Sequence, residues 1–237
     1  MFRSPHNRFL GNSFRRNGDI GIFAQGINDN LFKQNAFSGN REAGVLMEGD
    51  NRNQFRRNRL SRNGVGFDLG GNRNAIVGNR VFRSRGMPGQ IGVGIFISQG
   101  RRNLVARNLI ARSSNNGIRV GLPPAEVGGG PHAVGTVIRG NRLRVGGRGI
   151  GKGFPHLERD GVFVFKTAIR TLLLRNRARG FKDDGFDVRS PRTKLRRNRA
   201  FDNGDLGIEA VPGVIDGGGN VAGGSGDPFQ CTNVLCS

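Results

Sequence analysis

An asparagine recurs along this chain at intervals close to 22 residues, and this repeat limits the fold more than any other feature. Successive members of the series are separated by 23, 23, 21, 29, 33, 35 and 22 residues. The series consists of Asn12, Asn35, Asn58, Asn79, Asn108, Asn141, Asn176 and Asn198. A basal repeat with three insertions accounts for every interval, so the sequence predicts about eight structural repeats.

Each repeat contains two strand-like segments. One precedes the asparagine, and the other begins with a glycine that follows the asparagine by eight or nine residues in most repeats, as in Gly117-Ile118 and Gly207-Ile208. A unit this short has no room for a crossover helix, so neighbouring repeats are expected to pair as parallel strands about 4.8 Å apart. Asparagine suits the resulting ladder because it tolerates a left-handed turn and its amide both donates and accepts. The predicted fold is all-β, a single parallel β-helix of about eight coils.

Alternation after the glycine predicts a narrow, continuous core. The first inward position of the successive repeats is apolar throughout: Ile22, Val45, Phe67, Ile95, Ile118, Val162, Phe186 and Ile208. Only 35% of the chain is hydrophobic, and it contains no Trp or Tyr. A large globular core is therefore not expected, whereas a solenoid needs only a thin one.

The repeat pattern, seen clearly from Asn198 to Ala210, resembles the repeats of the pectate-lyase-like superfamily of right-handed parallel β-helices. The resemblance extends from about Asn7 to Ala210 and implies a right-handed solenoid. Members of that superfamily include polysaccharide lyases, glycoside hydrolases, epimerases, phage tailspikes, surface adhesins and copper-delivering proteins, so the fold alone does not select an activity. The stretch from Gly213 to Cys236 is similar to the end of secreted bacterial β-helix repeat proteins.

The chain is strongly basic, with 38 Lys and Arg against 17 Asp and Glu and a formal net charge of +21. This favours a polyanionic partner, of which acidic polysaccharide and nucleic acid are the two main classes. Nearly all of the basic residues are arginine, which codon usage in a GC-rich genome would also produce. We expect the arginines to be spread through all the turns, and no nucleic-acid motif appears, so nucleic acid is the less favoured partner. No apolar stretch approaches the ~20 residues of a membrane helix.

The chain ends carry two further predictions. Met1 starts within a repeat-like segment with no signal sequence before it, so we expect a secretory signal and an N-terminal cap either to be missing or to belong to an upstream segment. Residues 1–211 are predicted to form the β-helix and 212–237 a glycine-rich tail. Cys231 and Cys236 are the only cysteines, and we expect them to form a disulfide that ties down this tail, which implies a secreted or cell-surface protein. The alternative is a pair of reduced thiols.

Insertions mark one part of the outward surface of the glycine-led strands. The fourth and sixth repeats lengthen before the strand, over 83–93 and 143–160, and the fifth lengthens after it, over 121–135. These loops are expected to flank a groove over repeats four to seven. Its floor is predicted to contain Phe96, Arg119, Phe163, Phe165, Asp187 and Arg189. The same outward columns also contain Glu48 and Asp68, to which the sequence assigns no role.

Phenyl rings, guanidinium groups and carboxylates in one groove suit an acidic polysaccharide, because rings stack on sugars and Arg pairs with uronate carboxylates. Phe96, Phe163, Phe165, Arg189 and the loop residue His156 are therefore the candidate substrate-binding residues. The alternative is that the exposed Phe residues mark a packing or oligomer contact. Loop histidines, in turn, are usually bystanders.

Carboxylates supply the candidate catalytic groups. Asp187 and Glu209 fall in adjacent repeats and are expected to lie about 5 Å apart, the separation found in retaining glycosidases. Asp183-Asp184-Gly185 resembles part of the paired-aspartate motif of β-helix polygalacturonases, which implies a catalytic Asp184, although the other motifs of that family are absent. Asp160-Gly161 shows the same pairing one repeat earlier, so capping of the corner before the strand is the simpler interpretation.

The resemblance to pectate lyases implies a second chemistry, β-elimination, in which an arginine base acts beside calcium. Arg119 or Arg189 would be the base, and the possible calcium ligands are Asp160, Asp184 and Asp187. The sequence thus predicts a protein that binds an acidic polysaccharide and leaves open whether it cleaves the polymer. The rival hypothesis is a non-catalytic surface, adhesin or structural module.

Overall fold

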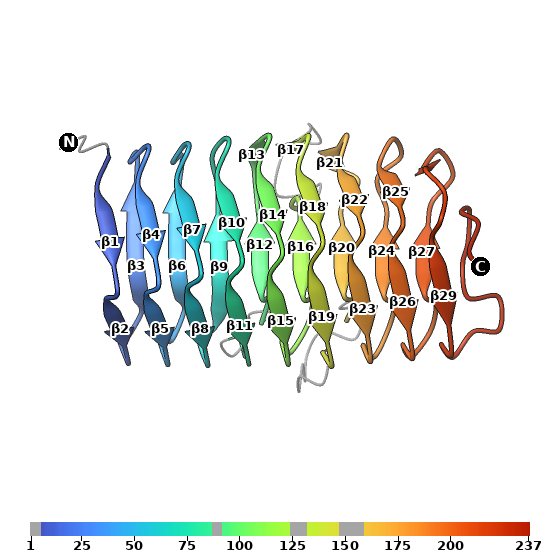
Figure 1. The fold of residues 1–237 in the computed structure, drawn as a ribbon, viewed down its shortest axis with the longest axis horizontal. Coiled ribbons are helices and arrows are strands. Elements are labelled where there is room, and N and C mark those ends of the chain that lie inside the picture. The colour runs from blue at the N-terminus through green and yellow to red at the C-terminus, as the bar shows by residue number, and fades with distance from the viewer. Residues whose placement is uncertain (1–5, 87–91, 124–131, 147–158) are drawn as a thin grey trace.

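The computed structural model describes residues 6–86, 92–123, 132–146 and 159–237. Throughout these residues the chain winds as a solenoid of short strands, with the two chain ends at opposite ends of the stack (Figure 1). Each coil crosses three sheets in the same order, A, then B, then C. Every strand pairs in parallel with the equivalent strands of the neighbouring coils.

Sheets A and B each have nine strands, and sheet C has eight. Sheet A consists of β1 (Arg8–Leu10), β4 (Leu31–Lys33), β7 (Gln54–Arg56), β10 (Ala75–Val77), β14 (Leu104–Ala106), β18 (Val137–Arg139), β22 (Leu172–Leu174), β25 (Lys194–Arg196) and β28 (Ile215–Asp216). Sheet B consists of β2 (Ser13–Arg15), β5 (Ala36–Ser38), β8 (Arg59–Ser61), β11 (Arg80–Phe82), β15 (Leu109–Ala111), β19 (Arg142–Arg144), β23 (Arg177–Arg179), β26 (Arg199–Phe201) and β29 (Val221–Gly223).

Sheet C contains the glycine-led strands and lies behind sheets A and B in Figure 1. It consists of β3 (Ile20–Gln25), β6 (Ala43–Glu48), β9 (Val65–Leu69), β12 (Ile95–Ile97), β16 (Ile118–Val120), β20 (Val162–Val164), β24 (Phe186–Val188) and β27 (Ile208–Ala210). A small fourth sheet joins β13 (Gly100–Arg101), β17 (Ala133–Val134) and β21 (Ala168–Ile169). The eight strands of sheet C agree with the predicted number of repeats, and the all-β solenoid is confirmed.

The repeated asparagines form the predicted ladder at the corner between sheets A and B. Asn58 is representative: its side-chain oxygen accepts from both the backbone and the side-chain nitrogen of Asn35, at 2.9 and 3.1 Å. Its own amide donates to the backbone oxygen of Phe32 at 2.9 Å and to Asn79 at 3.0 Å. The ladder satisfies corner groups that the sheets leave unpaired, and it continues one coil beyond the predicted series to Asn220.

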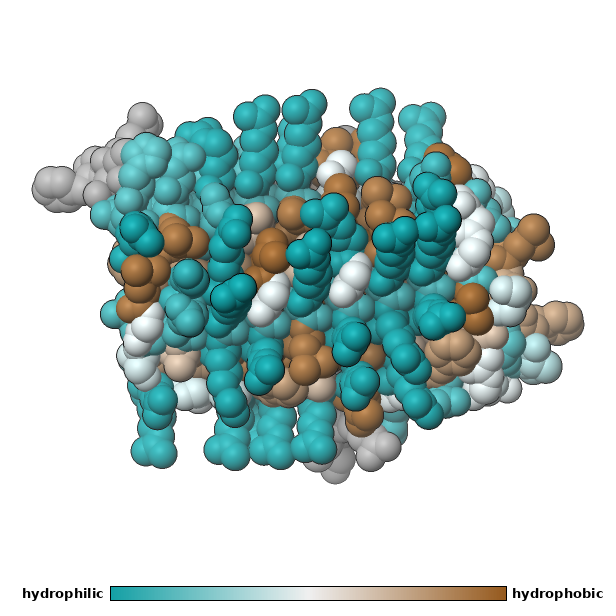
Figure 2. Space-filling model, in the orientation of Figure 1, coloured by the Kyte–Doolittle hydropathy of each residue, from teal (hydrophilic) through white to brown (hydrophobic). Residues whose placement is uncertain are grey.

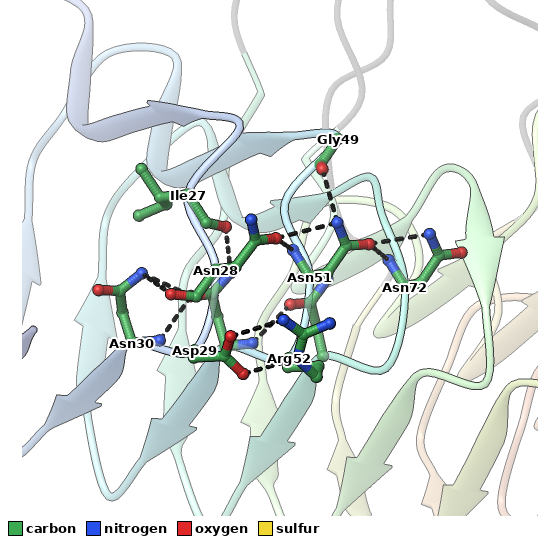
Figure 3. Close-up of polar contacts among 10 residues, drawn as sticks. Ile27, Asn28, Asp29, Asn30, Gly49, Asn51, Arg52 and Asn72 are labelled. Carbon is green, nitrogen blue, oxygen red and sulfur yellow. Dashed lines mark hydrogen bonds and ion pairs between the residues drawn. The ribbon is translucent and has the colours of Figure 1, made fainter. Parts of the chain in front are cut away.

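A second, more exposed asparagine ladder lies at the corner between sheets C and A (Figure 3). The amide of Asn51 donates to the side-chain oxygen of Asn28 at 2.9 Å, and Asn72 donates to Asn51 at 2.8 Å. Beside it, Arg52 forms a bidentate pair with Asp29 of the preceding coil at 2.6 Å. Polar ladders therefore support more than one corner of the solenoid.

The core consists of side chains stacked in register. Phe32 lies between Phe9 and Phe55, with ring centroids 4.6 and 4.7 Å away and nearly parallel planes. The inward residues of sheet C are fully buried from Val45 to Ile208. This confirms the narrow core predicted from the alternation.

The turn arginines differ from expectation in their arrangement. They are not merely spread over the surface, because the repeat places them one above another in columns. Arg62, Arg83 and Arg112 occupy the same turn of successive coils, and all three have left-handed backbones with φ between 56° and 60°. Figure 2 shows hydrophilic side chains projecting in rows from the face formed by sheets A and B.

Residues 212–237, predicted as a tail, add strands to two sheets. β28 pairs with β25 and β29 pairs with β26, which supplies the ninth strand of sheets A and B. Cys231 and Cys236 form the predicted disulfide. Cys231 bridges to Ile208 and Cys236 to Asn220, so the disulfide loop lies against the last coil.

Candidate active site on sheet C

The outward column of sheet C has the register predicted from the sequence. Phe96, Arg119, Phe163, Asp187 and Glu209 lie opposite one another on β12, β16, β20, β24 and β27. Parallel pairing therefore brings together side chains that are up to 113 positions apart in the sequence. His156, the loop candidate, lies outside the described residues.

Arg119 is held between two phenyl rings. Its guanidinium carbon is 5.2 Å from the centroid of Phe96 and 4.5 Å from that of Phe165. These distances are within the range of cation–π attraction, and the rings limit the motion of the side chain. Phe96, Arg119 and Phe165 are each half-buried, so an edge of this stack remains open to solvent.

Phe163 does not line an open floor as the alternation suggested. It is only 1% exposed, because Phe165 packs edge-on against it at 4.5 Å and Arg189 lies over its ring at 5.0 Å. Asp187 is also buried, at 2% exposure, and its carboxylate accepts from Nε of Arg189 at 3.0 Å. Both residues point out of the solenoid as predicted, but a second layer of side chains covers them. Phe163 therefore supports the neighbouring Arg189 and Phe165.

Four aspartates and a glutamate form two overlapping carboxylate groups beside this layer. Oxygens of Asp184, Asp187 and Glu209 lie within 4.8 Å of one another, and so do those of Asp160, Asp183 and Asp184. Of the first group, only Glu209 is exposed. Asp183 was not among the candidate residues, although it adjoins Asp184 in the sequence.

Burial sets the charge state of this cluster. Desolvation, reinforced by the charges of Asp183, Glu209 and Asp187, raises the pKa of Asp184 to about 8. Desolvation and the neighbouring aspartates also raise the pKa of Asp160 well above its usual range. At neutral pH the cluster therefore holds protons that exposed carboxylates would have lost.

Hydrogen bonds give Asp160 and Asp184 the corner role that was the simpler interpretation of the Asp-Gly pairs. Asp160 accepts from the side-chain amide of Asn116 at 3.2 Å and from the backbone N–H of Asp184 at 3.1 Å. Asp184 in turn accepts from the backbone N–H of Leu206 at 2.7 Å. Because the ladder engages both oxygens of Asp160, that residue is poorly placed as a metal ligand.

The remaining carboxylates suit a hard divalent cation. Asp184 precedes β24, Asp187 lies on β24, and Glu209 lies opposite Asp187 on β27. Calcium takes six to eight oxygen ligands. A cation would also relieve the mutual repulsion of three close carboxyl groups. Carboxylate oxygens are the donors that calcium takes, so Asp184, Asp187 and Glu209 are the residues that could hold it.

Asp68 is a half-buried acid on the same face, which the sequence placed in the column without a role. Desolvation raises its pKa to about 7, against a hydrogen bond from Ser98 and the charge of Arg119, which lower it. It lines a cleft of about 410 Å³ together with Glu48, Ser98 and Gln99. Its position in the outward column was the only sequence signal for this cleft.

The family model described as "Right handed beta helix region" matches residues 2–151, more than half of the chain. The chain belongs to this family. Its membership agrees with the resemblance seen in the repeats and with the parallel solenoid. No curated protein matches the sequence at a significant level.

Solved structures share the fold at low sequence identity. The alginate lyase from Paenibacillus sp. str. FPU-7 superposes with a TM-score of 0.67 at 12% identity, over 96% of this β-helix and 78% of the lyase. Pectate lyase Pel9A gives 0.61 at 15% identity, over 88% of this chain and 60% of that enzyme. The periplasmic alginate epimerase AlgG gives 0.55 at 19%, over 78% of this chain and 38% of the epimerase. This β-helix thus spans well under two thirds of the last two enzymes, and the likeness shows the fold alone.

No helix in the part of the chain that the structure describes has the length and apolar character to cross a membrane.

Proposed function

We propose that this β-helix binds an acidic polysaccharide along the outward face of sheet C, over the strands from β12 to β27. The observation that carries the proposal is the Arg119 stack, in which Phe96 and Phe165 hold a guanidinium in place. A fixed guanidinium pairs well with the carboxylate of a uronate, and the flanking rings offer apolar faces to sugar rings. Arg189 adds a second guanidinium, exposed and anchored by Asp187.

We further propose that the same face cleaves the polymer by β-elimination. Following the resemblance to pectate lyases, Arg119 first releases a proton to solvent and then, as the neutral guanidine, takes the proton from the carbon beside the uronate carboxylate. A carbon–carbon double bond then forms as the glycosidic carbon–oxygen bond breaks, and the leaving oxygen takes a proton from solvent. Asp184, Asp187 and Glu209 would hold calcium, which acidifies that C–H bond by neutralising the carboxylate. Arg119 is two strands from Asp187, about 10 Å between their backbones by the strand spacing.

The fold of the structural neighbours supports the choice of ligand. The three solved structures named above are, by their titles, enzymes of alginate or pectate, both acidic polysaccharides. The disulfide between Cys231 and Cys236 supports an oxidising compartment, where such polymers occur. We therefore propose a secreted or cell-surface protein.

The proposal is tested by incubating the protein with polygalacturonate, alginate and glycosaminoglycans, with calcium or with a chelator. Ultraviolet absorbance detects the unsaturated uronate that β-elimination leaves, and a reducing-end assay detects either kind of cleavage. We expect absorbance to rise on one polymer, and to be lost with chelator, with Arg119→Ala and with Glu209→Gln. Glu48→Gln, an exposed glutamate on β6 of the same sheet, is the matched control and should retain activity.

Two outcomes contradict the lyase. New reducing ends without absorbance would indicate hydrolysis by the Asp187 and Glu209 pair. Binding without either signal would leave a non-catalytic adhesin or surface module, and the absence of binding to every polymer would overturn the proposed function itself.

A further inference from the structure

A long groove lies on sheet B, away from the carboxylate cluster. It has a volume of about 1110 Å³ and extends over six successive strands, from β2 to β19. Five strand spacings of about 4.8 Å make it about 24 Å long. It is lined by Arg15, Arg16, Ser38, Gly39, Arg59, Ser61, Arg62, Phe82, Arg83, Ala111, Arg112, Arg144 and Val145.

Three small side chains and one phenyl ring form the floor of this groove, and arginines form its walls. The last residues of the strands follow one another in register as Ser38, Ser61, Phe82 and Ala111. Arg15 and Arg144 stand at the two ends of the same column. Along one side lies the turn column that contains Arg62, Arg83 and Arg112. No carboxylate is found among the described residues that line the groove, and none of its seven arginines forms an ion pair with the part of the chain that the structure describes.

The backbone does not require arginine in this turn. Gly39 and Gly180 occupy the equivalent position of other coils with φ of 68° and 74°, where glycine adopts the left-handed conformation without steric cost. Arg62 and Arg83 adopt it with φ of 58° and 56°, in direct succession. Like charges one strand spacing apart repel, so this column reduces the stability of the protein in the absence of an anionic ligand.

The distribution of charge also argues against a uniform excess of arginine. The strands of sheet B contain eight arginines and no acidic residue: Arg15, Arg59, Arg80, Arg142, Arg144, Arg177, Arg179 and Arg199. The strands of sheet C contain a single arginine, Arg119, and four acids: Glu48, Asp68, Asp187 and Glu209. Codon usage alone would place arginine equally often at the outward positions of both sheets.

We propose that the sheet B groove is a second binding site, which holds a linear acidic polysaccharide parallel to the axis of the solenoid. Over three successive coils the turn column presents one guanidinium per coil, from Arg62, Arg83 and Arg112. This spacing matches a polymer with one carboxylate per sugar ring, because a sugar ring and a strand spacing are of similar length. The serine hydroxyls on the floor suit sugar hydroxyls. Phe82 is the only aromatic side chain among the residues that line the groove, whereas single-stranded nucleic acid is usually held by successive stacking rings. The choice of polymer rests on the proposed function, but the groove itself does not.

The site is tested by fluorescence anisotropy with a labelled galacturonate oligomer long enough to span six strands. The groove variant is Arg62→Gln/Arg83→Gln/Arg112→Gln. The control variant, Arg107→Gln/Arg175→Gln/Arg197→Gln, changes the net charge equally and replaces arginines that have the same left-handed backbone, with φ of 54° to 55°, at the corner between sheets A and B. We expect the groove variant to bind about tenfold more weakly and the control to change little, with wild-type affinity falling as salt rises.

Equal weakening by both variants would show that binding follows net charge alone and would overturn the site. Tighter binding of a single-stranded polynucleotide than of the galacturonate oligomer, lost in the groove variant, would overturn the choice of polymer. Glu209→Gln and Arg119→Ala separate the two sites. Binding of the oligomer to the groove should persist in both variants, even if the function proposed for sheet C is wrong. Loss of binding in these two variants but not in the groove variant would place all binding on sheet C and overturn the groove site.

Discussion

The backbone N–H of Asp184 donates to the carboxylate of Asp160 at 3.1 Å, which joins two buried acids of adjacent coils into one polar ladder. On the other sheet corners, asparagine amides carry out the same task without a charge. Replacing the amide with a carboxyl group at this corner therefore places a titratable group where the fold needs only an acceptor.

Stability should fall as the pH rises. The pKa of Asp184 is raised to about 8 in the folded protein, against a usual value of 3.8, so the folded state binds a proton that the unfolded state releases. The corresponding stabilisation is complete below pH ~4 and is lost as the pH rises through about 8. Chemical denaturation at several pH values measures this slope.

Asp184→Asn retains the acceptor for Leu206 and should flatten the pH dependence. Asp205→Asn, which changes an exposed aspartate one coil away, should leave the slope unchanged. A wild-type stability that increases from pH ~4 to ~8 would contradict the assignment.

Calcium should raise the melting temperature if Asp184, Asp187 and Glu209 bind it, because a ligand that binds only the folded state stabilises that state. Glu209→Gln should remove most of this shift. Asp160→Asn should retain more of it, since that side chain is engaged in the ladder. Scanning calorimetry with and without calcium makes the measurement, and an equal shift in all three proteins would place the cation elsewhere.

The asparagine ladder should contribute strongly to stability in its middle and weakly at its end. Asn58→Ala would leave the N–H of Asn35 and the carbonyl of Phe32 buried without their partners, at a cost of about 2–4 kcal/mol. Asn12→Ala removes one side-chain bond to Asn35 at an exposed end and should cost under about 1 kcal/mol. Urea unfolding compares the two variants, and equal losses would mean that the ladder adds little.

The disulfide should stabilise the last coil against local unfolding. Replacing both cysteines with serine removes a cross-link with a sequence separation of 5, which the chain-entropy model values at about 2 kcal/mol. Hydrogen exchange should then increase first around Ile208 and Asn220, which bridge to the two cysteines. Unchanged exchange at both residues would show that other contacts hold this end.

The outward column shows how far the sequence determined the candidate site. Strand alternation and the repeat predicted that Arg119, Asp187 and Glu209 share a column, and the register confirms it. Exposure did not follow from that pattern. Whether an outward side chain is covered depends on residues beyond the strand, such as Phe165 and Arg189, whose positions the alternation does not fix.

The sequence by itself determined the architecture of this protein, because a period near 22 residues with apolar inward positions is compatible only with a stacked parallel solenoid. It also limited any disulfide within this chain to one pairing, Cys231 with Cys236, and the structure forms that bond. Only the tertiary structure decided which polar groups meet. Stacking converts a sequence interval into a short distance in space, so arginines that are spread along the sequence become a column, and acids from successive coils become a cluster whose burial sets its pKa values.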